Sequence, residues 1–328
     1  LLQEILSQCG TLQNRVGILD LRGAQLPDPV TFVQDQIEPF RAAVGQQYLK
    51  YGVAYYPFLK TTIHAESEIT CDMLGGAMAL AGVLPEASQE PVKGLLASLQ
   101  KTPVPNPAIR SQWEIALRQS SPTYTTLCQQ VCDRINILPP SGAMAGVYAR
   151  VDAERGVWVA PANVSLTEVV GTTLALTDDM QSGLNTDPLS GKSVNAIRVF
   201  PSLGTLVWGA RTLDGNSQDW RYISVVRTVI MIEQSVKFAM QAYVFQPNVA
   251  NTWNLVRATL TSFLTQLWSQ GTLAGSTPDA AFSVEVGLGA TMTSQDILNG
   301  LMIVSLKVAL THPAEFIVLT FAQQMQTS

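Results

Sequence analysis

The C-terminal third of this chain has almost no charged side chains, and this shortage strongly limits what the chain can fold into. Arg257 is the only charged residue between Phe238 and Pro278, and only four charged residues lie between Phe282 and Ser328. Charged residues make up 14% of the 328 residues, against about 25% in a typical soluble domain. A surface with so few charges must be covered, either by a large core of its own or by other subunits.

The composition also excludes several classes of protein. A net charge of −5 does not support binding to nucleic acid, which depends on clustered Lys and Arg. A hydrophobic content of 47% argues against disorder. The apolar run from Gly75 to Leu84 is shorter than the roughly 20 residues that a transmembrane helix needs, and no signal peptide is visible. Because the chain does not begin with Met, we expect the true N-terminus to precede Leu1.

The first sixty residues have the pattern of a parallel βαβ unit. The apolar runs Val16–Asp20 and Val53–Leu59 predict buried strands. Between them, apolar residues spaced three and four apart predict an amphipathic helix over Pro29–Val44, with Asp28 as its N-cap. A strand, a helix and a strand in about forty residues are typical of an α/β fold.

The middle of the chain is less regular. Residues 61–138 are interpreted as an insertion or subdomain, with a helix from Ile109 to Gln119. A further helix is predicted over Ala143–Ala153, and strands over Asn195–Phe200 and Thr205–Leu213. The fold class predicted from these patterns is mixed α/β.

Two long helices and a β-rich end complete the chain. The helices are predicted over Tyr222–Val244 and Val249–Gln270, and alternating apolar residues predict strands over Phe282–Val286 and Met302–Leu310. The segment Glu315–Phe321 is apolar on both faces and lacks protective charges. A strand of that kind favours pairing with another chain.

No group of residues predicts catalysis. Gly191–Ser193 is similar to the end of a P-loop, but Thr186 stands where the phosphate loop needs glycine, so we favour a surface turn. Gly287–Met292 lacks the third glycine of the dinucleotide fingerprint. Asp20 ends the first strand, where α/β enzymes place catalytic carboxylates, but no second acid follows at a usable spacing.

The cysteines and histidines leave a metal site open as an alternative. Cys128 and Cys132 could share a helix face, with His64 and His312 as the only histidines in the chain. Two buried thiols without a ligand are the interpretation that we favour. Two isolated histidines also make a catalytic triad improbable.

Arg211 and Arg221 flank the acidic loop Asp214–Asp219, which predicts a local ion pair. Trp208 and Trp220 are interpreted as packing residues at the boundaries of elements.

Seven short sequence motifs follow one another between residues 139 and 223. The motifs are Pro-Pro-Ser-Gly at 139–142, Gly-Val-Tyr-Ala-Arg-Val-Asp at 146–152, Arg-Gly-Val-Trp at 155–158, Ala-Pro-Ala-Asn at 160–163, Asn-Ala-Ile-Arg at 195–198, Val-Trp-Gly-Ala-Arg-Thr-Leu at 207–213 and Asp-Trp-Arg-Tyr-Ile at 219–223. The chain thereby resembles the contractile tail sheath family of myophage tails and phage-tail-like contractile injection systems. The resemblance is strong over residues 139–322 and looser over residues 1–60. The motif residues carried over are Pro161, Asn163, Trp208, Gly209, Arg211, Trp220 and Arg221.

The resemblance implies a structural subunit rather than an enzyme. Such subunits polymerise helically around an inner tube and contract to drive the tube through a target envelope. The implied partners are other copies of the chain, the tube protein, the baseplate and the tail terminator, with no cofactor, metal, nucleic acid or membrane insertion. Assembly in the bacterial cytoplasm is implied, as part of a virion tail or tail-like particle. The alternatives are an α/β enzyme or ligand-binding protein using Asp20, or a terminator or baseplate protein.

The resemblance also implies a domain organisation. Residues 1–60 with 139–200 would form the α/β part of the sheath core, residues 61–138 an insertion or outward-facing subdomain, and residues 201–328 a C-terminal domain. In this family, terminal arms add strands to the C-terminal sheet of a neighbouring subunit. We expect Arg257 to face the tube, and deletion of residues 315–328 to abolish assembly without unfolding the monomer. The residues expected to exchange between subunits are Glu315, Phe316, Ile317, Val318, Leu319, Thr320 and Phe321.

Overall fold

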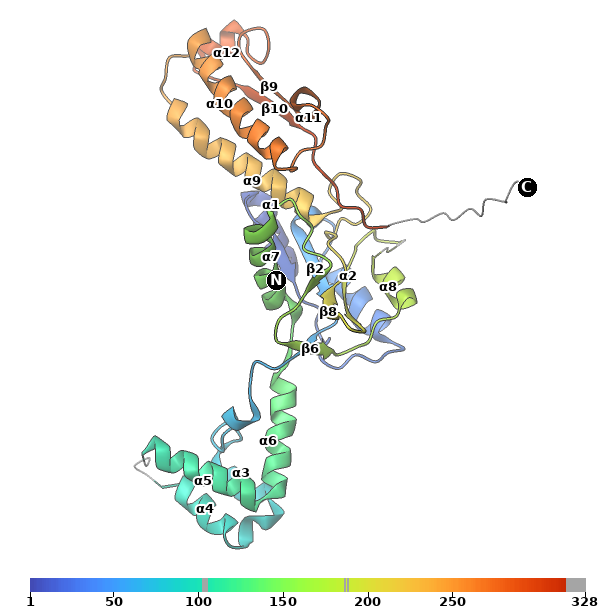
Figure 1. Ribbon diagram of the computed structural model, residues 1–328, viewed down its shortest axis with the longest axis vertical. Helices are drawn as coiled ribbons and strands as arrows, with labels where there is room; N and C mark the ends of the chain where they lie inside the picture. Colours follow the sequence, from blue (N-terminus) through green and yellow to red (C-terminus); the bar gives the residue numbers. More distant parts are fainter. Residues whose placement is uncertain (102–105, 186, 188, 317–328) are drawn as a thin grey trace, which may run out of the picture.

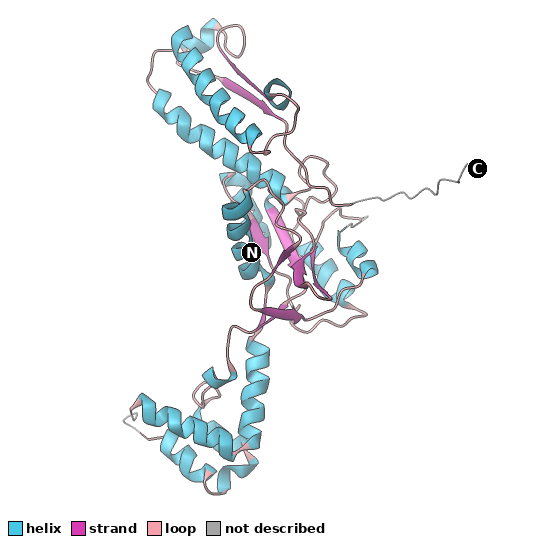
Figure 2. Cartoon of the chain, in the orientation of Figure 1, coloured by secondary structure: helices cyan, strands magenta, loops and turns pink. Residues whose placement is uncertain are grey.

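The computed structural model describes residues 1–101, 106–185, 187 and 189–316. Figure 1 shows an elongated molecule with an α/β core in the middle, a helical unit at one end and a unit of helices and a hairpin at the other. Figure 2 shows strands in the core and in the C-terminal unit, whereas the opposite end is helical. The predicted mixed α/β fold class is confirmed. No helix within the described ranges is long and apolar enough to cross a membrane.

A mixed sheet forms the centre of the core, in the order β1-β2-β7-β8-β5. Strands β1 (Gly17–Leu19), β2 (Gly52–Tyr56) and β7 (Asn195–Phe200) run parallel to one another. Strands β8 (Gly204–Val207) and β5 (Val164–Ser165) continue the sheet in antiparallel pairing. The parallel pairing of β1 with β2 confirms the predicted βαβ unit.

Helices cover both faces of this sheet. They are α1 (Leu2–Leu12), α2 (Glu38–Ala43), α7 (Pro140–Arg155) and α8 (Asp178–Asn185). Strand β2 is buried on both sides: Val53 and Tyr55 belong to the cluster that includes Met144 of α7, whereas Ala54 and Tyr56 belong to the cluster beneath α1 and α2. Successive residues of a strand point to opposite faces, so one strand joins the two halves of the core.

The helix predicted over Pro29–Val44 is confirmed from Phe32 to Ala43, although a π-helical part interrupts the regular α-helix. The carboxylate of Asp28 accepts hydrogen bonds from the amides of Val30 and Thr31, as predicted for the N-cap, and the π-helix η1 (Val33–Ile37) then leads into α2. Pro39 explains the interruption, because it has no N–H to donate to the carbonyl four residues earlier.

The helical unit contains a hydrophobic cluster of its own, which includes Leu80, Leu96, Leu117 and Tyr124. The chain leaves the core through β3 (Leu59–Thr61) and returns through β4 (Ile137–Leu138). Strand β3 lies in the middle of a small antiparallel sheet and pairs with β4 on one side and with β6 (Val169–Thr172) on the other. The elements of the unit are η3 (Glu66–Glu68), α3 (Gly76–Val83), η4 (Pro85–Ser88), α4 (Val92–Leu99), α5 (Pro107–Ser120) and α6 (Pro122–Ile135). Helix α5 confirms the helix predicted over 109–119.

The C-terminal unit consists of two long helices beside a two-stranded antiparallel sheet. Its elements are α9 (Ile223–Met240), η5 (Gln241–Tyr243), α10 (Ala250–Ser269), α11 (Pro278–Ala281), β9 (Phe282–Val286), α12 (Ser294–Leu298) and β10 (Val304–Val308). Leu264 and Ile232 lie in the cluster between the helices and the sheet. Both helices and both strands agree with the sequence prediction.

The last strand predicted from the sequence, over Glu315–Phe321, falls largely outside the described residues. Glu315 and Phe316 are described and are not in a strand. Residues 317–321 lie outside the described ranges, so the strand remains a prediction.

Candidate assembly surface

Strand β10 has a free edge. It pairs with β9 in the register Val304↔Val286 to Val308↔Phe282, and within the described residues no strand pairs with its other edge. The chain continues past β10 on the paired side, because Leu310 forms a bridge with Leu273 and the Ala309 amide donates to the Ala281 carbonyl. An unpaired edge of this kind can accept a further strand.

An apolar groove follows this free edge, and we call it the edge groove. One part, of about 320 Å³, lies between α9 and β10. A second part, of about 560 Å³, lies between the end of α9 and the residues that lead into β10. The first part is lined by Val229, Ile232, Glu233, Val236, Lys237, Leu306 and Val308, and the second includes Met240, Tyr243, Phe245, Met302 and Val304. Alternate residues of β10 therefore line the groove along the whole strand.

The pleat of β10 explains this arrangement. Val304, Leu306 and Val308 point toward the helices, as the alternation in the sequence predicts. Lys307 is on the opposite face, where its ammonium lies 4.0 Å from a carboxylate oxygen of Glu285. Both side chains are exposed, so this ion pair contributes little to stability. The apolar face of β10 extends beyond the cover that α9 and α10 provide.

The chain beyond β10 returns to the core, where Glu315 meets Arg211. The Arg211 Nε lies 2.9 and 3.0 Å from the two carboxylate oxygens, and one terminal nitrogen donates at 2.7 Å. The phenol of Tyr222 donates to the same carboxylate at 2.9 Å. Only 5% of the Arg211 side chain and 17% of the Glu315 side chain are exposed. We call these three residues the Glu315 clamp.

Neighbouring polar groups hold Arg211 in position. Its other terminal nitrogen donates to the Asn185 carbonyl at 3.0 Å, and its backbone amide donates to the side chain of Asn195 at 2.7 Å. Burial raises the pKa of Tyr222, and the hydrogen bond to Glu315 raises it further, so the phenol remains a donor. A bidentate guanidinium–carboxylate pair of this geometry is among the stronger polar contacts in proteins.

The local ion pair predicted around Asp214–Asp219 is wrong. Arg211 pairs with Glu315, which is 104 residues away, and Arg221 donates from Nε to the Gly215 carbonyl at 2.9 Å. The sequence prediction missed the Glu315 clamp because it searched only near the two arginines. Arg211 belongs to a motif of the sheath family and Glu315 lies in the segment Pro-Ala-Glu-Phe at 313–316, but nothing in their spacing links the two residues.

Trp208 and Gly209 follow the end of β8, which stops at Val207 rather than at the predicted Leu213. The ring of Trp208 packs against Phe200 at 4.6 Å between centroids and is 37% exposed. A Cβ at Gly209 would lie 2.7 Å from the Asn195 side-chain oxygen, so this close approach requires glycine. These residues shape the backbone that presents Arg211.

Three other motif residues have structural contacts. The Lys50 ammonium lies 3.8 Å from the centroid of the Trp220 ring, a cation–π contact. Asn163 adopts a φ of 54° and its amide donates to the Val207 carbonyl. Pro161 is buried next to it. A role for any of them in assembly stays a prediction.

Arg257 lies on the exposed side of α10, and one of its terminal nitrogens donates to the Val286 carbonyl at 2.6 Å. It is thereby fixed at the end of β9. That it faces a tube stays a prediction.

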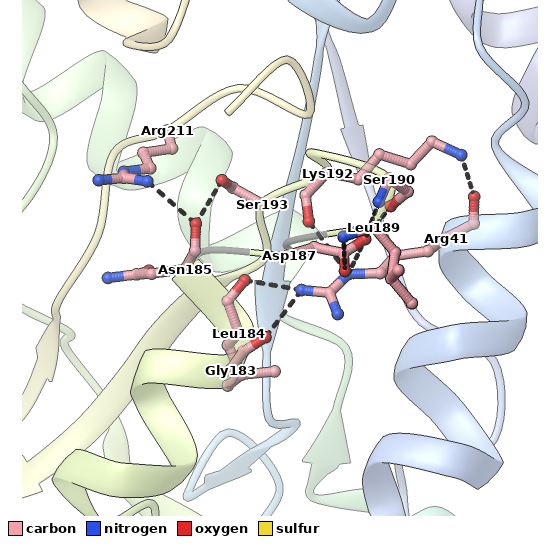
Figure 3. A network of polar contacts seen from close by, with 10 residues as sticks. All are labelled: Arg41, Gly183, Leu184, Asn185, Asp187, Leu189, Ser190, Lys192, Ser193 and Arg211. Carbon is pink, nitrogen blue, oxygen red and sulfur yellow. Dashed lines mark hydrogen bonds and ion pairs between the residues drawn. The ribbon is translucent and has the colours of Figure 1, made fainter. Parts of the chain in front are cut away.

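The surface turn predicted at Gly191–Ser193 is wrong, because Lys192 and Ser193 are buried. Figure 3 shows why. The Arg41 guanidinium donates to the carbonyls of Gly183, Leu184 and Lys192, and the Lys192 ammonium donates back to the Arg41 carbonyl. These acceptors are backbone carbonyls of the chain itself, so the contacts join α2 to the end of α8 and to the segment that follows it rather than form a phosphate cradle.

Asp187 completes this network. Burial opposes its ionisation, but hydrogen bonds from Ser190 and the Leu189 amide, together with the charge of Arg41, lower its pKa. Burial lowers the pKa of Lys192. The contacts are those of a packed interior.

Asp20 also has a structural partner. Its two carboxylate oxygens accept hydrogen bonds from the Ser141 amide at 3.0 Å and the Ser141 hydroxyl at 2.5 Å, at the start of α7. A carboxylate at a helix N-terminus satisfies free amides. The geometry therefore gives the candidate catalytic acid a role in holding α7 on β1.

The cysteines and histidines considered as metal ligands are not gathered in one place. Cys128 and Cys132 are buried in α6, and the Cys132 thiol lies beside the His64 carbonyl. His312 is elsewhere, and its ring packs edge-on against Tyr222 with 6.3 Å between the ring centroids. Across the described residues, no three His, Cys, Asp or Glu side chains come close enough to hold a metal ion.

Residues 216–324 match the family model described as the phage tail sheath C-terminal domain. The structure is similar to a chain of the anti-feeding prophage (AFP) helical sheath in the contracted state, with 44% sequence identity, a TM-score of 0.53 and coverage of 57% of this chain and 51% of that chain. The resemblance to contractile tail sheath proteins is confirmed.

Further relatives are of the same kind. A chain of the PVC sheath complex, an extracellular contractile injection system in the contracted state, is 46% identical with a TM-score of 0.54, over 57% of this chain and 52% of that chain. A prophage major tail sheath protein of Pseudomonas aeruginosa (strain UCBPP-PA14) is 27% identical over 138 residues, which are 40% of this chain and 34% of that protein. The chain thus spans about half the length of the solved chains and about a third of the Pseudomonas protein.

Proposed function

We propose that the chain is a structural subunit of a contractile sheath, which polymerises helically around an inner tube and contracts to drive the tube through a target envelope. The match of residues 216–324 to the sheath C-terminal domain carries this proposal, together with the similarity to two contracted sheath structures. The proposed partners are other copies of the chain, the tube, the baseplate and the tail terminator. The subunit would assemble in the bacterial cytoplasm and become part of a phage tail or tail-like particle.

The edge groove is the proposed acceptor for strand exchange. It offers a free strand edge above an apolar floor from α9, and the half-buried side chains of Val229 and Leu306 line it there. The donor would be residues 317–321 of another subunit, whose sequence is Ile-Val-Leu-Thr-Phe. Backbone hydrogen bonds would provide affinity, and apolar side chains would fill the hollows between α9 and β10.

The scarcity of charge in the C-terminal unit is consistent with this function. The outer face of α10 presents Asn254, Thr261 and Leu255, with Arg257 as its only charge. Contacts with neighbouring subunits and with the tube would cover this face. Residues 61–138 would form an outward-facing subdomain, because they have a hydrophobic cluster of their own and the chain enters and leaves them through β3 and β4.

A non-enzymatic role follows from this proposal. Asp20 is hydrogen-bonded to Ser141, and Lys192 is hydrogen-bonded to Arg41. Both candidate catalytic groups therefore have partners within the fold, and no observation favours the alternative of an α/β enzyme.

Negative-stain electron microscopy of the purified native particle tests the proposed function. We expect striated cylinders of stacked rings, in an extended or a contracted form. Particles without a sheath that contain this chain only at the baseplate or at the tail tip would contradict it, and would identify a baseplate or terminator protein instead.

A further inference from the structure

The sequence around β10 has the pattern of a β-hairpin within one chain. The segments 304–310 and 315–321 each contain seven residues of strand-like sequence, and only the four residues 311–314 separate them. Loops of two to five residues are typical of β-hairpins. The free edge of β10 and the apolar floor of the edge groove are available to such a hairpin. A chain that folded back in this way would occupy its own acceptor site.

The described residues show a different path. The Thr311 amide donates to the Thr272 carbonyl, which keeps the chain on the paired side of β10, and His312 packs against Tyr222. Glu315 is then bound by Arg211 in the core, and Phe316 is 71% exposed as the chain leaves the clamp. Residues 311–316 therefore lead away from the free edge rather than back to it.

We propose that the Glu315 clamp prevents the terminal arm from pairing with the sheet of its own subunit, so that the arm and the edge groove both remain available to neighbours. This inference rests on the strand exchange proposed above. Arg211 and Tyr222 are positioning residues, since they act on the start of the arm and do not touch the acceptor strand.

The physical reason is competition between intramolecular and intermolecular pairing. A strand joined to its acceptor by a short loop has a very high effective concentration, so self-pairing would exclude a neighbour's arm. The clamp opposes self-pairing because it binds Glu315 to the guanidinium of Arg211, and the core holds that guanidinium in place. Arg211 is itself held by the Asn185 carbonyl and the Asn195 side chain, both from the core.

A binding experiment with the arm as a separate peptide tests the clamp. The probe is a fluorescent peptide of residues 317–328, and the reference is a chain that stops after Phe316, whose edge groove is open. We expect the peptide to bind this truncated chain and the wild-type chain with affinities within about threefold. We expect Glu315→Gln to weaken binding at least tenfold in the full-length chain, because its own arm now occupies the groove.

Three further variants separate self-pairing from damage to the fold. Glu315→Gln in the chain that stops after Phe316 should regain the affinity of the truncated reference, because no arm is left to compete. Tyr222→Phe in the full-length chain removes one hydrogen bond of the clamp, and it should weaken binding by less than Glu315→Gln. Glu285→Gln neutralises a carboxylate on the opposite face of the sheet and should leave binding unchanged.

The outcomes distinguish the clamp from the proposed strand exchange. If full-length Glu315→Gln binds the peptide as tightly as the truncated reference, the clamp does not prevent self-pairing and the inference is wrong. If truncated Glu315→Gln fails to regain binding, the loss comes from the fold, and the inference is again wrong. If the truncated reference itself does not bind the peptide, strand exchange at the edge groove is contradicted, and the clamp has no role in it.

Discussion

The position at which the C-terminus is truncated should decide whether the loss of the arm also destabilises the monomer. Deletion of residues 315–328 removes the arm together with Glu315, which mixes two effects. A stop after Phe316 removes the arm alone and keeps the Glu315 clamp. We expect this shorter truncation to abolish assembly and to change the free energy of unfolding by less than about 0.5 kcal/mol, as for a surface change.

Glu315→Ala in the truncated chain isolates the second effect. Arg211 is 5% exposed, and without Glu315 its charge is buried with no salt-bridge partner among the residues that the structure describes. Removing one partner of a buried ion pair costs about 3–5 kcal/mol, a large part of a total stability of about 5–15 kcal/mol. Adding Arg211→Met should recover part of this loss, because the charge is removed and Ser193 still donates to the Asn185 carbonyl.

Urea unfolding followed by circular dichroism measures these free energies, and electron microscopy of the same samples measures assembly. A Glu315→Ala loss below about 1 kcal/mol would refute the reasoning, since that is the value of an exposed ion pair. Polymers of normal length from the chain that stops after Phe316 would refute the role of the arm.

Three other predictions follow from the described residues. Leu264→Ala should destabilise the chain by about 2–5 kcal/mol in urea unfolding, because its side chain is fully buried, whereas Ile115→Ala, at a site 55% exposed, should be nearly neutral. Val229→Asp places a charge in the edge groove and should block assembly while circular dichroism shows a folded monomer. The control Ile115→Asp, on the helical unit, should still allow assembly. Equal loss of assembly in both variants would contradict a specific role of the edge groove. Burial, ahead of the charges of Glu114 and Asp72, raises the pKa of Cys71 from 9.0 to about 12, so its alkylation at pH 8 should be about 10³-fold slower in the folded chain than in urea. The stability linked to this thiol should be fully present below pH 9.0 and lost as the pH rises through about 12, and rapid alkylation of the folded chain would show that the thiol is not buried.

Local patterns in the sequence predicted the elements of the fold well. Apolar spacing located α10, and the alternation of Val304, Leu306 and Val308 predicted both β10 and the face that it buries. These predictions succeeded because the period of a helix or a strand is a local property. The helix over Pro29–Val44 was confirmed from Phe32 to Ala43, but its π-helical part was not predicted, because the spacing of apolar residues does not show the effect of Pro39 on the turn before it.

Contacts between distant residues could not be predicted in the same way. Arg211 was assigned a partner in the adjacent acidic loop, but the fold brings it to Glu315 instead. Lys192 was expected on the surface, but Arg41 needs carbonyl acceptors, and the chain after α8 supplies them from the interior. In both cases the missing information was which segments meet in space, and a single sequence does not contain it in any local pattern.

The edge groove and its proposed donor strand were predicted only in part. The sequence predicted an unprotected apolar strand at Glu315–Phe321 as the donor, which still lies largely outside the described residues. The resemblance implied a neighbour's C-terminal sheet as the acceptor, but the sequence did not predict the groove, because the hollow along β10 arises from the relative position of α9 and the sheet. Val229 and Ile232 appeared in the sequence only as helix residues with nothing to mark them as part of a binding groove.

A cryo-EM reconstruction of the assembled particle tests the central claim most directly. The account predicts that residues 317–321 of one subunit form an additional strand on the free edge of β10 in another subunit, above Val229 and Ile232. It also predicts that Glu315 remains bound to Arg211 of its own chain. An empty edge groove, or a groove filled by the arm of the same subunit, would contradict the claim.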